Sequence, residues 1–263
     1  MLEIELGFVE RVVRGETAKT LLEEHTERYR FTGKLLRGRV ALDAACGSGY
    51  GLAILANSGA ARVIGLDASE RAIRLAKKEA CDPRIAIIRG DVTRLPIKSK
   101  VIDVAVCLET IEHLDDPAIC LREMYRVLRE TGCAVVSTPN KSVVSPNSAS
   151  PRNPYHVREF TVSEFEALLQ GLFSSVSLYG QTPRGNRRAL NVLLSISYVL
   201  HRLGLHAFLE RLRRMLEAHL RMRKAVRMRW TVALLQCPFQ VAPLSDNADT
   251  VPTYLTAHCE KAP

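Results

Sequence analysis

The stretch CLETIEHLDD, residues 107–116, places two glutamates and a histidine directly after an apolar run. Glu109, Glu112 and His113 are three and four residues apart, so they share one face if a helix begins near residue 109. Carboxylates and an imidazole on one face can move protons or hold a divalent cation. The same three residues can equally form a polar helix turn in which His113 is hydrogen-bonded to a loop. The sequence leaves both interpretations open.

A second group of residues points to a nucleotide. In LDAACGSGYG, residues 42–51, the glycines allow a sharp turn and a close approach of the backbone to a ligand at a helix N-terminus. The next apolar run ends in Asp67, whose carboxylate can accept hydrogen bonds from both hydroxyls of a ribose. A dinucleotide and S-adenosylmethionine both fit this spacing. Asp43 beside the turn favours S-adenosylmethionine, because its cationic amino group suits an acid that would repel a pyrophosphate.

The elements that must position these residues alternate between strands and helices. Short, continuously apolar runs predict buried parallel strands, and the patterns between them have helical spacing. The predicted strands cover 39–45, 61–67, 85–91, 101–109, 133–139, 174–180 and 253–262. The predicted helices cover 17–36, 50–57, 69–80, 117–129 and 162–171. This order predicts a doubly wound, Rossmann-like α/β fold.

A chain of 263 residues, 47% of them hydrophobic, can bury one substantial core. We expect a main domain over 1–182, a basic helical insertion over 183–250 and a terminal strand over 251–263 that completes the sheet. The first residues lack the pattern of a secretory signal, and no apolar stretch approaches the roughly 20 residues that cross a bilayer. The seven cysteines form no CxxC pair, so we expect neither disulfides nor a thiolate zinc site. We therefore expect a cytoplasmic protein.

The positive charge is concentrated in one segment. Between Pro183 and Thr231, twelve Lys and Arg residues stand against two Glu residues, whereas the formal charge of the whole chain is +9. This segment could be a lid over the acceptor side of the site, or an amphipathic element that binds anionic lipid and makes the protein peripheral to a membrane. It could also bind RNA, although few aromatic residues are interleaved with the basic ones.

On these motifs the chain resembles the class I S-adenosylmethionine-dependent methyltransferases. Their acid-GxGxG motif is matched by Asp43 to Gly49, with Ala45 in place of the first glycine. The resemblance implies a seven-stranded sheet with an antiparallel last strand at its edge, and contact between the cofactor's adenine and Asp91. It also implies that Tyr29 or Arg30, in the helix before the first strand, reaches the cofactor's carboxylate. The implied cofactor-binding set is Asp43, Ala45, Cys46, Gly47, Gly49, Asp67, Ala68, Asp91, Val92, Leu108, Tyr29 and Arg30.

Within that family the chain resembles proteins that carry STPNK and NPYHVREFT, segments found here at 137–141 and 153–161. Ubiquinone-pathway O-methyltransferases and small-RNA 2′-O-methyltransferases have an ExxEH motif followed by a later histidine. In the RNA enzymes these residues bind Mg²⁺, and the resemblance places the matching residues here at Glu109, Glu112, His113 and His156. The cation would be Mg²⁺ or Zn²⁺, since two imidazoles also suit zinc. Without a metal, His113, His156 or Glu109 would act as the catalytic group near the acceptor.

The sequence therefore predicts an S-adenosylmethionine-dependent methyltransferase that methylates a hydroxyl group. The expected acceptor is a small molecule, a sugar or a lipid-linked intermediate. Two alternatives remain open at this stage. One is a metal-assisted RNA 2′-O-methyltransferase, and the other is a non-catalytic cofactor-binding or scaffold protein, for which Ala45 is the only support.

Overall fold

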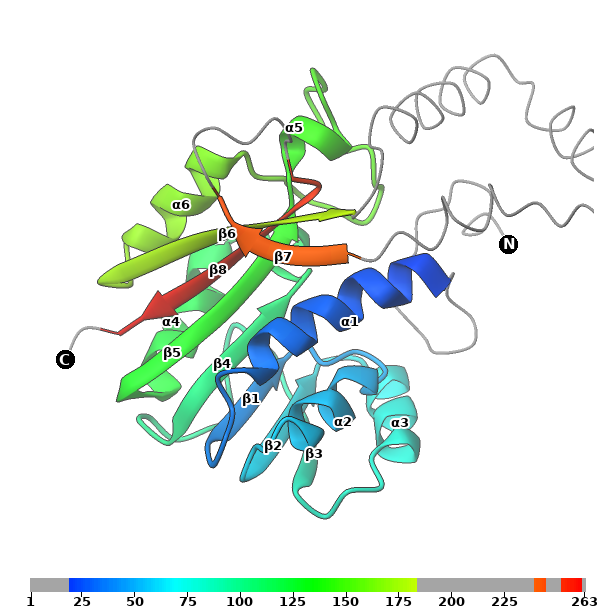
Figure 1. The fold of residues 1–263 in the computed structure, drawn as a ribbon, viewed down its shortest axis with the longest axis vertical. Helices are drawn as coiled ribbons and strands as arrows, with labels where there is room; N and C mark the ends of the chain where they lie inside the picture. The colour runs from blue at the N-terminus through cyan, green and yellow to red at the C-terminus, as the bar shows by residue number, and fades with distance from the viewer. Residues whose placement is uncertain (1–18, 184–238, 245–251, 262–263) are drawn as a thin grey trace, which may run out of the picture. The chain divides into compact units, whose positions relative to one another are not determined.

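A computed structural model describes residues 19–183, 239–244 and 252–261 of the chain (Figure 1). The helices are α1 (Lys19–Gly33), α2 (Tyr50–Asn57), α3 (Glu70–Glu79), a 3₁₀ turn η1 (Ile111–His113), α4 (Pro117–Val127), α5 (Lys141–Val144) and α6 (Val162–Gln170). The strands are β1 (Val40–Ala44), β2 (Arg62–Asp67), β3 (Ile85–Arg89), β4 (Ile102–Leu108), β5 (Leu128–Pro139), β6 (Ser175–Pro183), β7 (Phe239–Pro243) and β8 (Tyr254–Glu260). None of the described helices is both long and apolar enough to span a bilayer.

The strands form one mixed sheet in the order β3-β2-β1-β4-β5-β8-β6-β7. The first five pair in parallel, and β8 pairs antiparallel with both β5 and β6. All seven strands expected from the sequence are present, and the last one is antiparallel as expected. Its expected place at the edge is wrong, because Thr256 lies opposite Ser137 on one side and Tyr179 on the other. Figure 1 shows β8 in red between β5 and β6.

Strand β7 was not predicted. It falls inside the range 183–250, which the sequence suggested as a helical insertion, and it extends the sheet beyond β6. A five-residue strand at a sheet edge depends on the pairing that its neighbour offers more than on its own propensity. The rest of the expected insertion lies outside the described residues, as does most of its basic charge.

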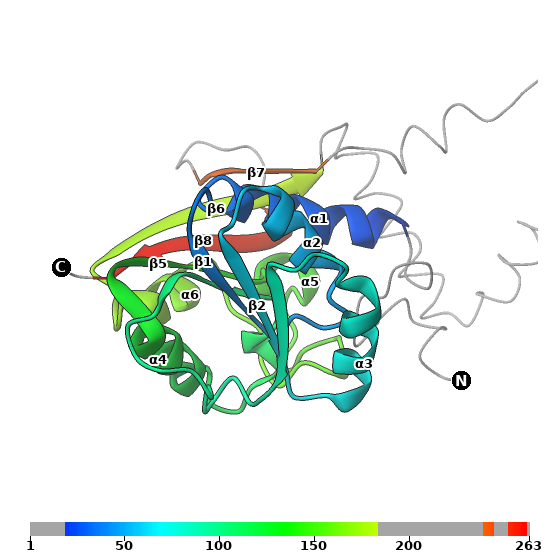
Figure 2. The same ribbon diagram turned by 90° about the horizontal axis from the view of Figure 1, so that it is seen from below.

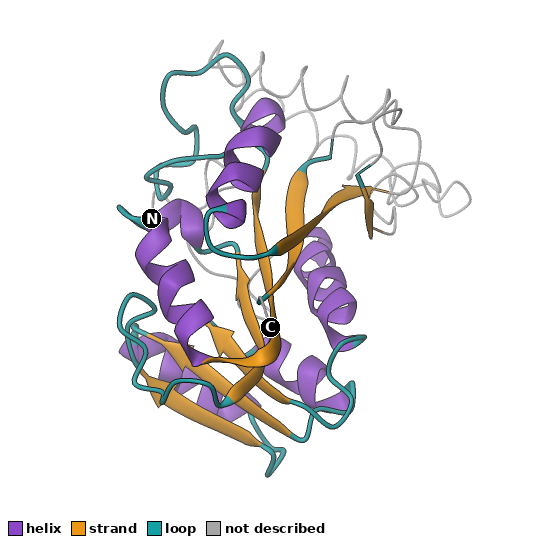
Figure 3. Ribbon diagram, turned by 90° about the vertical axis from the view of Figure 1, so that its left-hand side faces the viewer, coloured by secondary structure: helices purple, strands orange, loops and turns teal. Residues whose placement is uncertain are grey.

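The two faces of the sheet are covered by different helices (Figure 2). Successive residues of a strand point to opposite faces, and Ala41 and Leu42 of β1 belong to separate apolar clusters. Helices α1 and α2 pack on the face that Ala41 shares, whereas α4 and α6 pack on the face of Leu42. Figure 3 shows helices on both faces of the sheet, the arrangement that buries parallel strands completely.

Strand β1 lies at the point where the order of the parallel strands reverses, with β2 on one side and β4 on the other. In open α/β sheets, crevices that bind ligands form outside the carboxyl ends of the strands at this point. The turn after β1 and the stretch after β4 therefore border the same crevice, although 60 residues of chain separate them. These are the two segments that the sequence singled out.

Candidate active site

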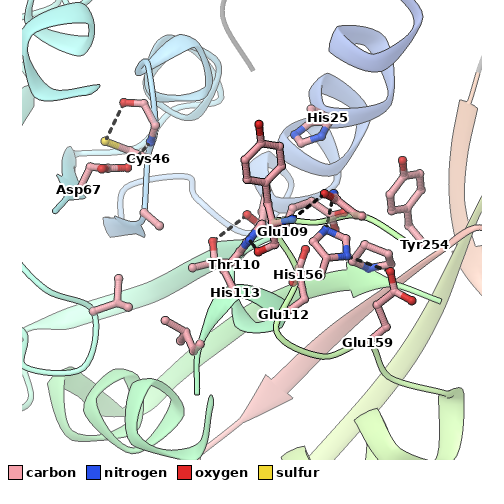
Figure 4. Close-up of a pocket in the computed structure, with 18 of the residues that line it drawn as sticks. His25, Cys46, Asp67, Glu109, Thr110, Glu112, His113, His156, Glu159 and Tyr254 are labelled. Carbon is pink, nitrogen blue, oxygen red and sulfur yellow. Dashed lines mark hydrogen bonds and ion pairs between the residues drawn. The ribbon is translucent and has the colours of Figure 1, made fainter. Parts of the chain in front are cut away.

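A cavity of about 630 Å³ opens at the carboxyl ends of β1, β2 and β4 (Figure 4). It joins the glycine-rich turn to the Glu and His residues that follow β4. Of the expected cofactor-binding residues, those that line it are Tyr29, Ala45, Cys46, Gly47, Asp67, Ala68, Asp91, Val92 and Leu108. Of the expected catalytic and metal-binding residues, Glu109, Glu112, His113 and His156 line it. The two halves of the predicted site therefore share one cavity.

The turn after β1 is held in shape by Asp67. The N–H of Gly47 donates to Asp67 Oδ2 at 3.0 Å, and the N–H of Ser69 donates to Oδ1 at 2.8 Å. Each carboxylate oxygen can accept a further hydrogen bond, so Asp67 remains suited to a pair of ribose hydroxyls. Ala45 has a positive φ of 69°, the left-handed conformation that a glycine adopts without cost. The turn thus keeps its shape where the family's glycine is absent.

Two glycines of the motif serve packing. A Cβ on Gly49 would lie 2.7 Å from Ala76 of α3, and φ at Gly49 is +83°. A Cβ on Gly51 would lie 2.1 Å from the ring of Tyr29. Gly49, although expected among the cofactor-binding residues, does not line the cavity. Its role in the structure is to let helices α2 and α3 approach closely.

Tyr29 and Asp43 form a buried pair below the turn. The hydroxyl of Tyr29 donates to Asp43 Oδ2 at 2.9 Å, while Asp43 Oδ1 has no hydrogen-bond partner among the described residues. Burial raises the pKa of Asp43 to about 7, the Tyr29 hydrogen bond opposes this rise, and the charge of Asp67 adds to it. Asp43 itself lies behind the cavity wall. Arg30 is also not part of the wall, because it projects from the exposed face of α1 and pairs with Glu27.

Asp91 stands at the other end of the cofactor half, after β3. Its Oδ1 accepts from the N–H of Thr93 at 2.8 Å and from the Thr93 hydroxyl at 2.7 Å. These two bonds lower the pKa of Asp91. A carboxylate kept ionised beside Ala68, Val92 and Leu108 offers an acceptor next to an apolar wall, which suits the amine and the ring of an adenine.

The cluster after β4 brings together three of the four expected metal ligands. The atoms of Glu112, His113 and His156 that could bind a metal ion all lie within 4.8 Å of one another. Glu112 is fully buried, accepts from the Thr138 hydroxyl at 3.1 Å, and has no partner for Oε1 among the described residues. Burial, and then the charge of Glu109, raises its pKa well above the ordinary range. An unpartnered buried carboxyl beside two imidazoles fits either a bound cation or a proton held for catalysis.

Glu109 does not join this cluster. Its Oε1 accepts from the Ser137 hydroxyl at 2.7 Å and lies 3.9 Å from Arg28 Nε. Its backbone has a positive φ of 49°, and its N–H donates to the Ser137 carbonyl at 3.1 Å. Such strained conformations cluster at functional sites, where surrounding contacts enforce them. Residue 109 therefore does not begin the shared helix face that the spacing suggested, and η1 begins only at Ile111.

The loop after β5 carries His156 into the cavity. It is fastened to η1 by two hydrogen bonds, because the N–H groups of Val157 and Arg158 donate to the carbonyl of Glu112 at 2.8 and 3.2 Å. In addition, His113 Nδ1 lies 2.7 Å from the carbonyl of Tyr155. The two imidazole rings meet edge to face with centroids 5.0 Å apart. Segments 43 residues apart in the chain are thus fixed against each other.

Sequence reasoning missed one wall of the cavity. Leu21 and His25 were not expected, although they precede the expected Tyr29 at intervals of four residues on α1 and line the cavity with it. Arg28 was also missed and is fully buried. Its guanidinium donates to Gln181 and lies 4.4 Å from the ring centroid of Tyr254, which closes the cavity from β8. No local signal connects Tyr254 with α1, because 226 residues separate it from Arg28.

Comparison with known proteins shows which proteins this chain is similar to. Residues 42–136 match the family described as methyltransferase domain. A probable S-adenosylmethionine-dependent methyltransferase of Mycolicibacterium smegmatis is 40% identical over 146 residues, which is 56% of each chain. A ubiquinone biosynthesis O-methyltransferase of Neisseria meningitidis is 32% identical over 111 residues, 41% of this chain and 47% of that protein. The chain thus matches about half the length of these relatives.

A solved structure supports the same fold over most of the chain. The S-adenosylmethionine-dependent methyltransferase of Thermotoga maritima superposes with a TM-score of 0.58 and covers 92% of both chains, at 15% sequence identity. Similarity at that level concerns the fold alone, whereas the domain match and the relatives concern the family. Residues 42–136 therefore match a methyltransferase domain, and the fold is that of the class I S-adenosylmethionine-dependent methyltransferases, as the sequence motifs predicted.

Proposed function

We propose that this protein transfers a methyl group from S-adenosylmethionine to a hydroxyl group of a small-molecule, sugar or lipid-linked acceptor. One observation carries the proposal. A single cavity joins Asp67 and Asp91, the acids expected to bind ribose and adenine, to the imidazoles of His113 and His156. When bound, S-adenosylmethionine supplies a methyl carbon on a cationic sulfur, and a hydroxyl that accepts this methyl must give up its proton.

The residues present fit the cofactor. Asp67 can accept from two hydroxyls, and Asp91 offers an acceptor beside an apolar surface. Asp43 does not line the cavity itself, but its Oδ1 is buried and has no hydrogen-bond partner among the described residues. The protein's contribution to such a transfer is chiefly alignment of the reacting groups, and a nearby base removes the proton. Imidazoles often act as general bases, and His113 and His156 line the cavity next to Glu112. His25 also lines the cavity, but burial and then the charge of Arg28 lower its pKa well below the ordinary value.

Two binding measurements and one transfer measurement test the proposal. Calorimetric titration should show binding of S-adenosylmethionine and of S-adenosylhomocysteine, and Asp67→Asn should weaken both. Cofactor labelled in the methyl group should then label an acceptor in fractionated cell extract, in a product that resists the treatments that cleave esters. Binding without any labelled product in any fraction would favour a non-catalytic cofactor-binding protein. The only sequence support for that alternative was Ala45 in place of a glycine. Because Ala45 adopts the left-handed conformation that the glycine would adopt, this support is weakened.

A second candidate is metal-assisted transfer, which the cluster of Glu112, His113 and His156 favours. A cation held there would lower the pKa of an acceptor hydroxyl. Exhaustive chelation distinguishes the two mechanisms. If methyl transfer is unchanged after chelation, a histidine removes the acceptor's proton without a metal. If transfer is lost and then restored by Mn²⁺, Mg²⁺ or Zn²⁺, the cluster binds a cation that transfer requires. RNA 2′-O-methylation belongs to the second outcome and requires that a short RNA is labelled.

The basic segment 185–231 lies outside the described residues, and contact with a membrane surface through it remains a proposal drawn from its charge. Sedimentation with vesicles that contain anionic lipid, compared with neutral vesicles at two salt concentrations, tests that contact. Binding to anionic vesicles at low salt, lost at high salt, is the expected result.

A further inference from the structure

His156 is held at both ring nitrogens. Its Nδ1 lies 2.9 Å from Glu159 Oε1, and its Nε2 lies 2.8 Å from Asn153 Nδ2. The side chains of His156 and Glu159 are only 8% and 2% exposed, so neither exchanges these partners freely for water. Figure 4 shows Glu159 beside His156 on the side of the ring away from Cys46 and the glycine-rich turn.

The orientation of Asn153 determines where His156 carries its proton. The backbone N–H of Tyr155 donates to Asn153 Oδ1 at 3.0 Å, and an N–H requires an acceptor, so the oxygen of the amide is at that position. The amide nitrogen must then face His156. Because an amide NH₂ group only donates, His156 Nε2 must accept and therefore carries a lone pair.

The contact at Nδ1 of His156 indicates the same tautomer. With a lone pair on Nε2, the proton of the neutral imidazole is on Nδ1, which donates to the carboxylate oxygen of Glu159. Glu159 Oε2 is buried and has no hydrogen-bond partner among the described residues, so the bond to His156 is the contact that compensates this carboxylate. Asn153 and Glu159 thus select the same tautomer from opposite sides.

We propose that Glu159 is a positioning residue that makes Nε2 of His156 the basic nitrogen facing the acceptor. This inference rests on the proposed function for its catalytic consequence. The acceptor hydroxyl would take the place of the Asn153 amide at Nε2. Its proton moves to Nε2, its bonding electron pair stays on the acceptor oxygen, and the proton then leaves to water. The imidazolium formed in between is stabilised by the adjacent carboxylate of Glu159.

The neighbouring histidine, His113, is held at Nδ1 by a backbone group. His113 also carries its proton on Nδ1, because the partner of that nitrogen is the carbonyl oxygen of Tyr155, which can only accept. The buried carboxyl of Glu112 also has an oxygen within 4.8 Å of a ring nitrogen of His113. Both imidazoles therefore have Nε2 as the unprotonated nitrogen, and Glu159 is the acid that is hydrogen-bonded to the ring of His156.

The tautomer can be measured without any activity. In protein labelled with ¹⁵N-histidine, at a pH of about 8 where an ordinary imidazole is neutral, long-range ¹H–¹⁵N correlation separates protonated from unprotonated ring nitrogens. A His156→Gln variant assigns the signals. We expect an unprotonated Nε2 and a protonated Nδ1 in the wild type. A wild-type His156 with its proton on Nε2 would overturn the inference.

Two substitutions test the role of Glu159. Glu159→Leu removes the acceptor, and we expect a mixture of tautomers and a kcat lowered about 10–100-fold, with KM for S-adenosylmethionine unchanged. Glu159→Gln keeps an acceptor oxygen, and we expect it to keep the tautomer and to recover part of kcat. Glu166→Gln, which changes a carboxyl on α6 outside the cavity wall, is the matched control and should match the wild type.

Different results would contradict the role of Glu159 and the proposed methyl transfer. If Glu159→Leu leaves both the tautomer and kcat unchanged, Glu159 does not position His156. Should Glu159→Leu fail to fold, the wild-type spectrum and Glu159→Gln still decide the tautomer. Absence of cofactor binding by calorimetry, with the expected tautomer in the spectrum, would remove the proposed function and leave the assignment of the imidazole intact.

Discussion

The buried carboxyl of Asp43 makes a quantitative prediction for the substitution Asp43→Asn. The side chain is 1% exposed, and burial raises its pKa from the ordinary value of 3.8 to about 7. Asparagine has nearly the same shape and still offers an oxygen to the Tyr29 hydroxyl, which donates to Asp43 at 2.9 Å. It never ionises. Asp43→Asn therefore removes one titration and changes little else in the packing.

The sign follows from the proton balance. The folded protein keeps a proton on Asp43 that the unfolded chain releases between about pH 4 and 7, so ionisation costs stability as pH rises through that window. Below pH 4 the cost is absent, and above pH 7 it is complete. A shift of about three pKa units corresponds to about 4 kcal/mol. The free energy of unfolding of Asp43→Asn, relative to wild type, should thus rise by about 4 kcal/mol between pH 4 and pH 8.

Urea unfolding without cofactor, followed by circular dichroism at pH 4.5, 6 and 8, measures this difference. Both proteins contain every other titrating group, so only the change with pH reports on Asp43, and equal m-values show that the unfolded states are comparable. Tyr29→Phe is the informative control, because it removes the bond that holds the pKa of Asp43 down and should move the window upward. A relative stability that stays constant to within about 1 kcal/mol across this range would refute the reasoning.

The remaining predictions concern the turn, the packing below it and the cap of α6. Ala45→Gly should raise the free energy of unfolding by up to about 1 kcal/mol, because it relieves the left-handed φ of 69°, and calorimetry should show unchanged cofactor affinity. Gly51→Ala should cost about 1–3 kcal/mol in urea unfolding and weaken cofactor binding, because the new methyl group would displace the ring of Tyr29. Thr161→Ala should cost about 1 kcal/mol, because it removes the capping box with Glu164, and should leave affinity for the cofactor intact, since α6 adds no residue to the cavity wall.

The cofactor half of the site was predictable because its signals are local. The turn after β1 and the acid that ends β2 lie within 25 residues of each other, and the alternation of strands and helices fixes where they meet. Asp67 and Asp91 therefore line the cavity as expected, and so do the small residues beside them. Arg30 is not in the cavity wall because a helix turns 100° per residue, so the neighbour of Tyr29 projects to the exposed face.

The acceptor half was predictable only in part. The spacing of Glu109, Glu112 and His113 suggested a common helix face, but Ser137 and Arg28 hold Glu109 apart, and both contacts come from distant segments. The pairing of β8 between β5 and β6 likewise depends on strands at the end of the chain. Contacts of this kind depend on tertiary packing, which spacing along the chain does not encode.

This division explains why the relatives inform the cofactor more than the acceptor. The family match ends at residue 136, so it includes the turn and Asp67 and Asp91, the acids expected to bind ribose and adenine, but not His156, Glu159 or Tyr254. Those three residues line the cavity on the side where we propose that the acceptor binds, and they come from the loop after β5 and from β8. The choice of acceptor depends on the residues that touch it. Of the residues in the proposed acceptor half, Glu112 and His113 lie within the matched segment, whereas His156, Glu159 and Tyr254 lie beyond it. If related proteins use different acceptors, we expect their sequences to differ in the loop that corresponds to 145–160, whereas Asp67→Asn in this protein should weaken binding of S-adenosylmethionine. A chimera that carries this loop from the Neisseria enzyme, assayed for cofactor affinity and for the labelled product, tests that separation: retained affinity with an altered product supports it, and lost affinity contradicts it.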